Sequence, residues 1–180
     1  MKPLISVIIP CFNTAEYLPQ CMESLEKQTI GFENLQLIFI DDASTDNGNT
    51  WNCILQFEKK HPNEVIAVHL DENQAQGGAK NVGMSYAEAE YIGFVDSDDW
   101  IEADMYRKLY ECVEKYQCDA ADCCIIKNYS NGREVIFSKQ GDIYDKFEKS
   151  IVEGGTHWIK DFSHAGYGSY LVTGIYKKNI

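Results

Sequence analysis

The stretch YIGFVDSDDW (residues 91–100) joins a run of apolar, β-forming residues directly to three aspartates within four positions. The apolar half is typical of a strand buried inside a sheet. Aspartates that lie close together repel one another, and each carboxylate loses hydration when it is partly buried. The stretch therefore predicts either a positive charge at the tip of this strand or a turn that uses the carboxylate oxygens.

Around this stretch, strand patterns alternate with helix patterns over the first 126 residues. Strands separated by helices predict an α/β fold, with a Rossmann-like, mainly parallel sheet flanked by helices on both faces. Thr14 is expected to cap the first helix and Asp46 the second. We expect strands at residues 4–10, 35–40, 64–70, 91–95 and 120–129, and helices at 14–29, 46–60, 77–90 and 102–116.

The pattern changes after residue 127. The pair Asn131-Gly132 is typical of a two-residue hairpin turn. A short helix is expected near 143–152 and a final strand within 169–178. The chain stops on KKNI in mid-pattern, which predicts a domain that continues beyond Ile180.

Charge restricts the partners that this chain can bind. With 180 residues, 44% of them hydrophobic, it is long enough for one domain with a core. Its net charge of −12 and pI near 4.7 argue against nucleic acid and anionic membrane surfaces, which attract basic proteins. An anionic ligand chelated by a metal stays compatible, because the metal supplies the positive charge locally.

The seven cysteines do not form a disulfide or zinc framework, because their number is odd and no C-x-x-C pair occurs. Several lie inside apolar runs, where reduced cysteine acts as a small hydrophobic residue. We therefore expect a reducing compartment, the cytoplasm. The apolar start of the chain is too short for a signal peptide, and no run is long enough to span a membrane.

Polar residues gather where the expected strands end. Asn13 follows the first strand, Asp41 and Asp42 the second, and Asp96 to Asp99 the fourth. Ligands of open α/β sheets bind at the carboxyl ends of the strands, near a topological switch point. These residues therefore predict one site.

Within that site, Asp96 and Asp98 are spaced so that both can face one small volume. Asp98 can then ligate Mg²⁺ or Mn²⁺ while Asp96 reaches a ribose hydroxyl, with substrate phosphates and water completing the metal shell. A simpler alternative is that these aspartates cap the helix expected to begin near Glu102. A dinucleotide site is not expected, because the turn after the first strand (residues 10–17) lacks G-x-G-x-x-G.

Five sequence blocks, taken together and in order, favour a ligand site over a helix cap at these aspartates. The blocks are SVIIPCFN (6–13), YLPQCMESLEKQT (17–29), LIFIDDASTD (37–46), ENQAQGGAKNVGM (72–84) and YIGFVDSDDW (91–100). In this combination the chain resembles the catalytic domain of family 2 glycosyltransferases, which have the GT-A fold. The resemblance covers residues 4–126 well and the last eight residues more faintly.

The resemblance implies roles for individual residues. Asp42 would accept a hydrogen bond from the imide nitrogen of a uracil-like base, Asp96 would contact the ribose, and Asp98 would ligate the metal. Asp99 would support or cap this group. The full set of implied nucleotide-sugar-binding residues is Pro10, Phe12, Asn13, Asp42, Lys80, Asn81, Asp96 and Ser97.

Two positions depart from the family pattern. Lys80 replaces the arginine of the usual A-R-N, which keeps the attraction for phosphate but loses the planar fork for bidentate contacts. Ala75 replaces a common glycine, and we expect Gly77 and Gly78 to restore flexibility to that loop.

The resemblance implies an inverting, metal-dependent transfer of a sugar from a nucleotide-diphosphate donor, UDP-linked in our reading, to a carbohydrate or lipid-linked acceptor. Surface or capsular polysaccharide synthesis is the expected setting, in the cytoplasm and with association to the inner face of the membrane left open. Residues 1–126 would bind the donor and 127–180 would form the acceptor side of the same domain. The catalytic base is expected beyond Ile180.

Two other functions stay open at the level of sequence. A sugar-phosphate nucleotidyltransferase also combines an α/β sheet with a D-x-D-like metal site, although it would need a glycine-rich basic loop after the first strand. A domain that binds a nucleotide sugar without turnover is the non-enzymatic alternative. A homodimer is neither indicated nor excluded.

Overall fold

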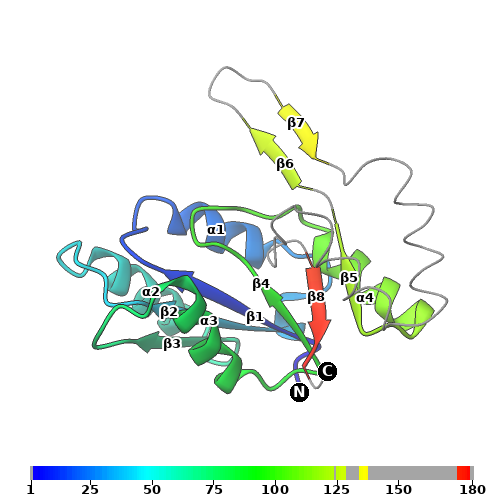
Figure 1. The fold of residues 1–180 in the computed structure, drawn as a ribbon, viewed down its shortest axis with the longest axis horizontal. Coiled ribbons are helices and arrows are strands. Elements are labelled where there is room, and N and C mark those ends of the chain that lie inside the picture. The colour runs from blue at the N-terminus through cyan, green and yellow to red at the C-terminus, as the bar shows by residue number, and fades with distance from the viewer. Residues whose placement is uncertain (1, 124, 129–133, 138–173, 179–180) are drawn as a thin grey trace.

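A computed structural model describes residues 2–123, 125–128, 134–137 and 174–178 (Figure 1). Within these residues the chain forms a six-stranded sheet with the order β3-β2-β1-β4-β8-β5. The strands in that order are β3 (Val65–His69), β2 (Leu35–Asp41), β1 (Ile5–Cys11), β4 (Tyr91–Phe94), β8 (Gly174–Lys177) and β5 (Ala120–Asp122).

The sheet is mainly parallel, as the sequence predicts. Strands β1 to β4 all run in one direction, and β8 is antiparallel to both β4 and β5. All seven residues of β1 are buried, because a central parallel strand is covered on both faces and must be apolar throughout.

The expected strand at 120–129 is wrong in its extent. β5 ends at Asp122, and β6 (Ile125–Asn128) instead pairs with β7 (Glu134–Phe137) in a separate two-stranded sheet. The antiparallel pairing of β6 and β7 confirms a hairpin on either side of Asn131-Gly132. The turn itself, and the helix expected near 143–152, lie outside the described residues.

Four α-helices and one 3₁₀ helix of the described chain connect the strands. Each α-helix overlaps a helix expected from the sequence, with ends shifted by a few residues. The helices are α1 (Leu18–Glu26), η1 (Phe32–Asn34), α2 (Asn49–Lys60), α3 (Ala75–Tyr86) and α4 (Met105–Tyr116).

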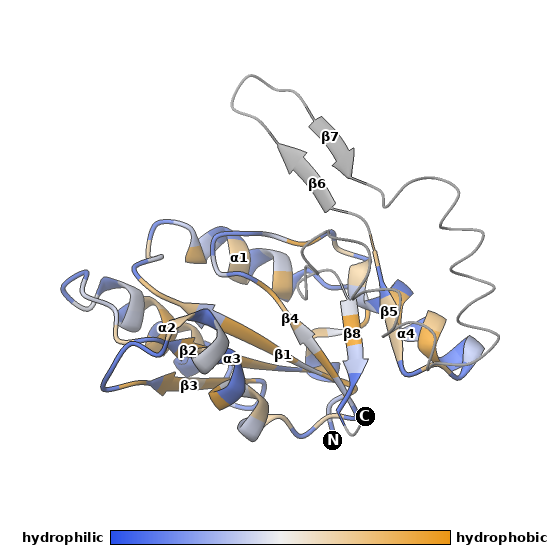
Figure 2. Ribbon diagram, in the orientation of Figure 1, coloured by the Kyte–Doolittle hydropathy of each residue, from blue (hydrophilic) through white to orange (hydrophobic). Residues whose placement is uncertain are grey.

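The helices cover both faces of the sheet, which confirms the expected layers. Helices α1, α2 and α4 pack on the face formed by alternate strand residues such as Val7 and Phe39. Helix α3 packs on the opposite face, against Ile8 and Ile38. Hydrophobic residues accordingly gather on the strands, and hydrophilic residues occupy the loops (Figure 2).

The two expected helix caps differ in outcome. Asp46 is not the N-cap residue of α2, which is Gly48, but it lies close to the expected place: its Oδ2 accepts hydrogen bonds from the backbone nitrogen (3.0 Å) and hydroxyl (2.6 Å) of Thr50 in the first turn. Thr14 does not cap α1 through its side chain. The helix begins at Leu18, and only the Thr14 carbonyl accepts hydrogen bonds from the Tyr17 and Leu18 amides.

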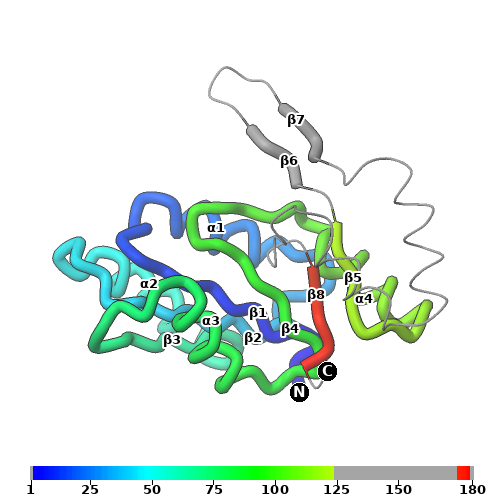
Figure 3. The backbone as a smooth tube through the Cα atoms, in the orientation of Figure 1, coloured from blue at the N-terminus to red at the C-terminus, as the bar shows by residue number. Residues whose placement is uncertain are grey.

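The loop after β4 runs beside α1, as Figure 3 shows when the chain is followed out of β4. Ser24 and Gln28 of α1 hold this loop: the Ile101 amide donates to the Ser24 hydroxyl, and the Gln28 amide donates to the Glu102 carbonyl oxygen. These bonds fix the path of the segment that carries the aspartates.

Candidate functional site

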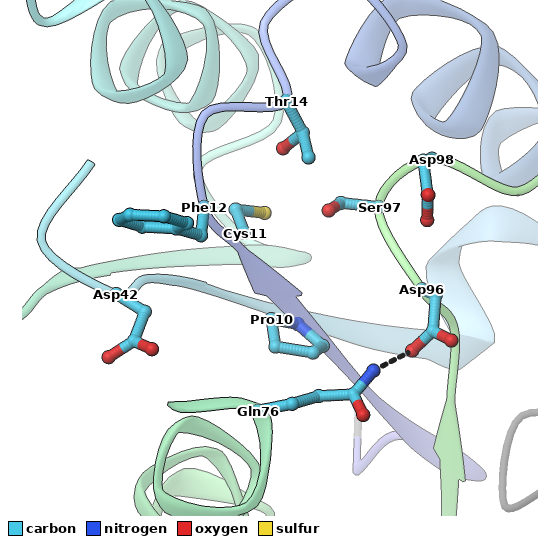
Figure 4. Close-up of a pocket in the computed structure, with 9 residues that line it drawn as sticks. All are labelled: Pro10, Cys11, Phe12, Thr14, Asp42, Gln76, Asp96, Ser97 and Asp98. Carbon is cyan, nitrogen blue, oxygen red and sulfur yellow. Dashed lines mark hydrogen bonds between the residues drawn. The ribbon is translucent and has the colours of Figure 1, made fainter. Parts of the chain in front are cut away.

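A cavity of about 190 Å³ opens at the carboxyl ends of β1 and β4 (Figure 4). β1 pairs with β2 on one side and with β4 on the other, so this is the switch point of the sheet, where α/β proteins bind ligands. The lining residues are Pro10, Cys11, Phe12, Thr14, Asp42, Gln76, Asp96, Ser97 and Asp98.

The acidic side of the cavity comes from the loop after β4. Asp96, Ser97 and Asp98 lie across the cavity from Phe12 and Asp42 (Figure 4). Ser97 is buried and Asp98 is exposed. The backbone turns tightly here, since the Asp99 amide donates to the Asp96 carbonyl oxygen at 3.0 Å.

The aspartates repel one another as the sequence suggests. The pKa of Asp99 is raised, first by loss of hydration and then by the negative charges of Asp98 and Asp96. They do not cap α4, because that helix starts at Met105 with Asp104 as its N-cap residue. The charges therefore stay uncompensated by a helix end.

Asp96 is held by two residues of α3. Its Oδ1 accepts a hydrogen bond from Gln76 Nε2 at 2.8 Å (Figure 4) and lies 3.4 Å from Lys80 Nζ. The Lys80 side chain is 12% exposed, and its ammonium group lies 5.7 Å from the centre of the Phe94 ring. Lys80 thus places a shielded positive charge beside the acidic wall without lining the cavity itself.

The opposite wall is formed by the ends of β1 and β2. Phe12 is 46% exposed, whereas Asp42 is 3% exposed. Asp42 Oδ1 accepts the backbone amide of Gln74 at 2.7 Å, and its carbonyl oxygen accepts the Asn73 side-chain amide at 3.0 Å. The start of α3 therefore fixes the orientation of the Asp42 carboxylate.

Besides Lys80, two of the expected binding residues, Asn13 and Asn81, lie outside the cavity lining. Asn13 has a left-handed backbone (φ 55°) and clamps the loop after β2: its Oδ1 accepts the Thr45 amide at 2.7 Å and its Nδ2 donates to Thr45 Oγ1 at 3.2 Å. Asn81 is exposed on α3 and does not line the cavity. Asn13 thus shapes the site through the loop, and Asn81 has no contact with it in this structure.

Three lining residues are not among the binding residues expected from the sequence: Gln76, Cys11 and Thr14, the last of which was expected only as a helix cap. A signal for Gln76 was present, because it lies four residues before Lys80 and so shares its helical face. Cys11 and nearby Cys21 are neutral thiols. Burial raises the pKa of both, followed for Cys21 by the charges of Asp99, Asp98 and Asp96, which bring its value to about 12.

The loops around the cavity hold strained backbone. Among the described residues, Asn13, Ala43, Asn47 and Ala75 adopt left-handed φ values of 55–58° in the segments that follow β1, β2 and β3. Ala75 keeps this conformation without the glycine that favours it.

The expectation for Gly77 and Gly78 is wrong. Both lie inside α3, where the helical hydrogen bonds fix their backbone, so they do not loosen the loop.

Within the part of the chain that the structure describes, no three His, Cys, Asp or Glu side chains are grouped to hold a metal ion. The same residues include no helix of the length and apolarity needed to cross a bilayer.

The sequence model of the protein family described as "Glycosyl transferase family 2" matches residues 6–172 of this chain. The chain belongs to this family. The match confirms the resemblance seen in the five blocks and extends it beyond residue 126.

Curated relatives are bacterial glycosyltransferases. The chain is 38% identical over 131 residues to glycosyltransferase GlyG of Streptococcus pneumoniae, covering 73% of this chain and 40% of GlyG. It is 33% identical to the poly(ribitol-phosphate) β-N-acetylglucosaminyltransferase TarP of Staphylococcus aureus, covering 88% of this chain and 53% of TarP. The chain thus spans about half the length of these relatives or less.

Solved structures share the fold. S. aureus TarS 1–349 in complex with UDP-GlcNAc superposes with a TM-score of 0.57 at 30% identity, over 67% of this chain and 33% of TarS. The mannosyltransferase PcManGT of Pyrobaculum calidifontis, in complex with GDP-Man and Mn²⁺, gives a TM-score of 0.61 at 23% identity, over 68% of this chain and 36% of PcManGT. The α/β GT-A architecture expected from the sequence is thereby confirmed.

Proposed function

We propose that this chain is the donor-binding part of an inverting, metal-dependent glycosyltransferase that takes its sugar from a UDP-linked donor. The observation that carries the proposal is the cavity at the switch point, which brings Asp42 and Phe12 together with Asp96 and Asp98 from a distant segment. Family membership favours sugar transfer over the nucleotidyltransferase alternative.

The nucleotide lies, in this proposal, on the wall formed by the ends of β1 and β2. Phe12 offers an exposed ring for stacking on a base. The fixed Asp42 carboxylate offers an acceptor for an imide N–H, which uracil has. The complex of TarS with UDP-GlcNAc, at 30% identity, supports a uridine nucleotide.

The diphosphate then points toward the acidic wall. Asp98 is the proposed ligand of Mn²⁺ or Mg²⁺, and Asp96 the proposed ribose contact. These residues fit such an ion: their mutual repulsion would be relieved by a dication, and Mg²⁺ in particular is usually held by one or two carboxylates with substrate phosphates and water. When bound, the ion neutralises the diphosphate leaving group as a Lewis acid.

Lys80 is placed to add positive charge at the same point. Its ammonium group is held beside Asp96 and shielded from solvent, so its attraction for phosphate oxygens is only weakly screened. Because lysine is a point charge, we expect it to attract the diphosphate without fixing its geometry.

The catalytic base is proposed to come from outside the described residues. An inverting transfer needs a carboxylate that removes the proton of the acceptor hydroxyl. Asp42 is fixed by the Gln74 amide and Asp96 is bonded to Gln76, while Asp98 is assigned to the metal. None of the cavity acids is therefore assigned this step.

The acceptor is proposed to be a hydroxyl of a surface polymer, because TarP is by name a transferase for poly(ribitol-phosphate) and GgaB is by name a protein of teichoic acid biosynthesis. The buried thiols Cys11, Cys21 and Cys118 are free, which supports a reaction in the cytoplasm. The net charge of −12 gives no separate support for an acceptor bound to an anionic membrane.

Titration calorimetry with UDP, with and without Mn²⁺, tests this proposal. We expect binding that depends on the metal, and we expect Asp98→Asn to weaken the Mn²⁺-dependent binding at least about tenfold, as for loss of a charged contact. Glu111→Gln is the matched control, since Glu111 pairs with Arg107 on the exposed face of α4 and should leave binding unchanged.

UDP affinity that is the same with and without Mn²⁺ would contradict the metal assignment. Absence of UDP binding under both conditions would contradict the donor assignment as well.

A further inference from the structure

A buried carboxylate lies next to the nucleotide wall, the name used here for the cavity wall formed by the ends of β1 and β2. It belongs to the residue that precedes Asp42 in the chain. Asp41, the last residue of β2, is fully buried. Its Oδ2 lies 2.8 Å from His69 Nδ1, and its Oδ1 accepts the backbone amide of Ser44 at 3.3 Å. The Ser44 amide, together with His69 when its Nδ1 carries the proton, donates to a carboxylate that would otherwise be costly to bury.

The position of His69 follows from the sheet register. β2 and β3 are parallel, and Asp41 and His69 are directly paired residues at their carboxyl ends. The imidazole also packs against Trp51 of α2, with ring centres 5.2 Å apart. His69 thus lies between a carboxylate and an indole, at the carboxyl end of β3, which is an edge strand of the sheet (Figure 1).

Asp41 anchors the loop that carries the nucleotide-binding carboxylate. The loop begins at Asp42, passes through Ala43 in a left-handed conformation, and returns at Ser44 to the Asp41 side chain. The Ser44 hydroxyl then accepts the Asn13 amide at 2.9 Å. The contacts form one continuous path from His69 through Asp41 to both loops of the nucleotide wall.

We propose that His69 is a positioning residue of the nucleotide site: its Nδ1–H holds Asp41, and Asp41 holds the loop that sets the place of Asp42 and Asn13. The inference rests on the proposed binding of a uridine nucleotide at this wall. Among the contacts of the described residues, His69 reaches this loop through the Asp41 carboxylate. Its removal leaves a buried carboxylate with one donor fewer and loosens a loop that already contains strained residues.

Three variants separate this role from a general effect on folding. His69→Leu removes the donor, whereas His69→Asn places a side-chain amide N–H near the position of Nδ1 and should rescue the contact. His61→Leu is the matched control, because His61 also pairs with a carboxylate, Glu26, and packs against aromatic rings, but at the far end of α2. UDP affinity in the presence of Mn²⁺ is measured by calorimetry on the full chain, with thermal unfolding alongside.

We expect His69→Leu to weaken UDP binding about tenfold, as for one hydrogen bond to a charged group. His69→Asn should recover most of that loss, and His61→Leu should lower stability without changing the affinity. Equal affinity of His69→Leu and the unaltered chain overturns the inference, as does equal weakening by His69→Leu and His69→Asn. If the unaltered chain fails to bind UDP, the proposed function itself fails, which is a different result.

The nitrogen NMR signals of His69 test the contact in the unaltered chain, even if the leucine variant does not fold. The proposal requires a proton on Nδ1 at neutral pH. A neutral imidazole protonated on Nε2 alone would overturn it.

Discussion

At the level of one residue, Asp99 shows that the carboxylates of the acidic loop repel one another. Its pKa is raised by loss of hydration and by the charges of Asp98 and Asp96. An acid with a folded-state pKa above its unfolded value destabilises the fold once the pH exceeds the unfolded value, since the folded state then disfavours the ionised form. The loop is therefore under electrostatic stress at neutral pH.

Replacing Asp99 by Asn should relieve that stress. We expect Asp99→Asn to raise the unfolding midpoint at pH 7, with the gain shrinking as the pH falls toward about 4, where the aspartate becomes protonated in both states. Thermal unfolding followed by circular dichroism across this range measures the difference.

Asp104 gives a control of opposite sign. Its pKa is lowered, chiefly by a hydrogen bond from Lys108, so its ionised form stabilises the fold. Asp104→Asn should therefore lower the midpoint at pH 7, and this loss should also shrink toward low pH. A loss of stability in Asp99→Asn at pH 7 would contradict the account of the acidic loop.

Ala75 carries strain of a different kind, because its backbone is left-handed (φ 58°). Ala75→Gly should stabilise the chain by up to about 1 kcal/mol, the left-handed penalty less the extra freedom of glycine in the unfolded state. Ala79→Gly, in the interior of α3, should instead destabilise it by at least about 1 kcal/mol. Urea unfolding of both variants decides the sign, and destabilisation by Ala75→Gly would contradict the strained geometry.

At the scale of residues, the sequence predicts the positions of the cavity aspartates better than those of the asparagines. Asp42, Asp96 and Asp98 line the cavity as expected, because charged residues at the ends of buried strands have few places to go. Asn13 was expected to face the ligand, but its left-handed backbone turns its side chain toward Thr45. That contact joins residues more than thirty positions apart and leaves no local signal.

At the scale of elements, α3 is the piece that joins both walls of the cavity. Its start orients Asp42, and its side chains Gln76 and Lys80 hold Asp96. The helix reaches this position because Gly83 lets it approach β1: a Cβ there would lie 2.4 Å from Ile8 Cγ2. The placement of the site thus depends on one close helix–strand contact.

A pair of glycines in α3 tests this dependence. Gly83→Ala should destabilise the chain by about 1–3 kcal/mol through overpacking against Ile8. Gly77→Ala should stabilise it by up to about 1 kcal/mol, because a Cβ at Gly77 meets no atom and alanine favours the helix. The free energy of unfolding in urea measures both, and similar effects of the two substitutions would show that α3 does not pack closely on β1.

The elements themselves were largely predictable, since continuous apolar runs define β1, β2 and β4 and periodic ones define the helices. The ends were less so. Pro19 favours the first turn of a helix, and α1 accordingly begins at Leu18 rather than at Thr14. The break after Asp122 could not be read from 120–129, because apolar residues continue on both sides of Asp122 up to Ile126 and only the different partner strands separate the two halves.

At the scale of the whole molecule, the last described strand, β8, joins β5 to the rest of the sheet. β8 lies between β4 and β5, far from both in sequence, and Ile175 is fully buried there. The Lys178 ammonium group also donates to the carbonyl oxygen of Ala87, close to the start of β4. Sequence patterns predicted a strand here but not its place, because the order of strands depends on contacts across some eighty residues.

Removing this strand should therefore lower the stability of the sheet that carries the cavity, although β8 contributes no residue to the cavity lining. Deleting residues 174–180 exposes the edge of β4 and loses a buried isoleucine worth about 1.5–3 kcal/mol, together with two ladders of hydrogen bonds. We expect the unfolding midpoint to fall by about 10 °C or more, or the transition to lose its cooperativity.

Deleting only residues 179–180 keeps β8 and is the matched control, which should unfold as the unaltered chain does. Because UDP binding depends on the same sheet, the larger deletion should also abolish the calorimetric signal at the temperature where it unfolds. A deletion of 174–180 that unfolds at the unaltered midpoint would show that residues 2–123 form a complete folding unit without β8.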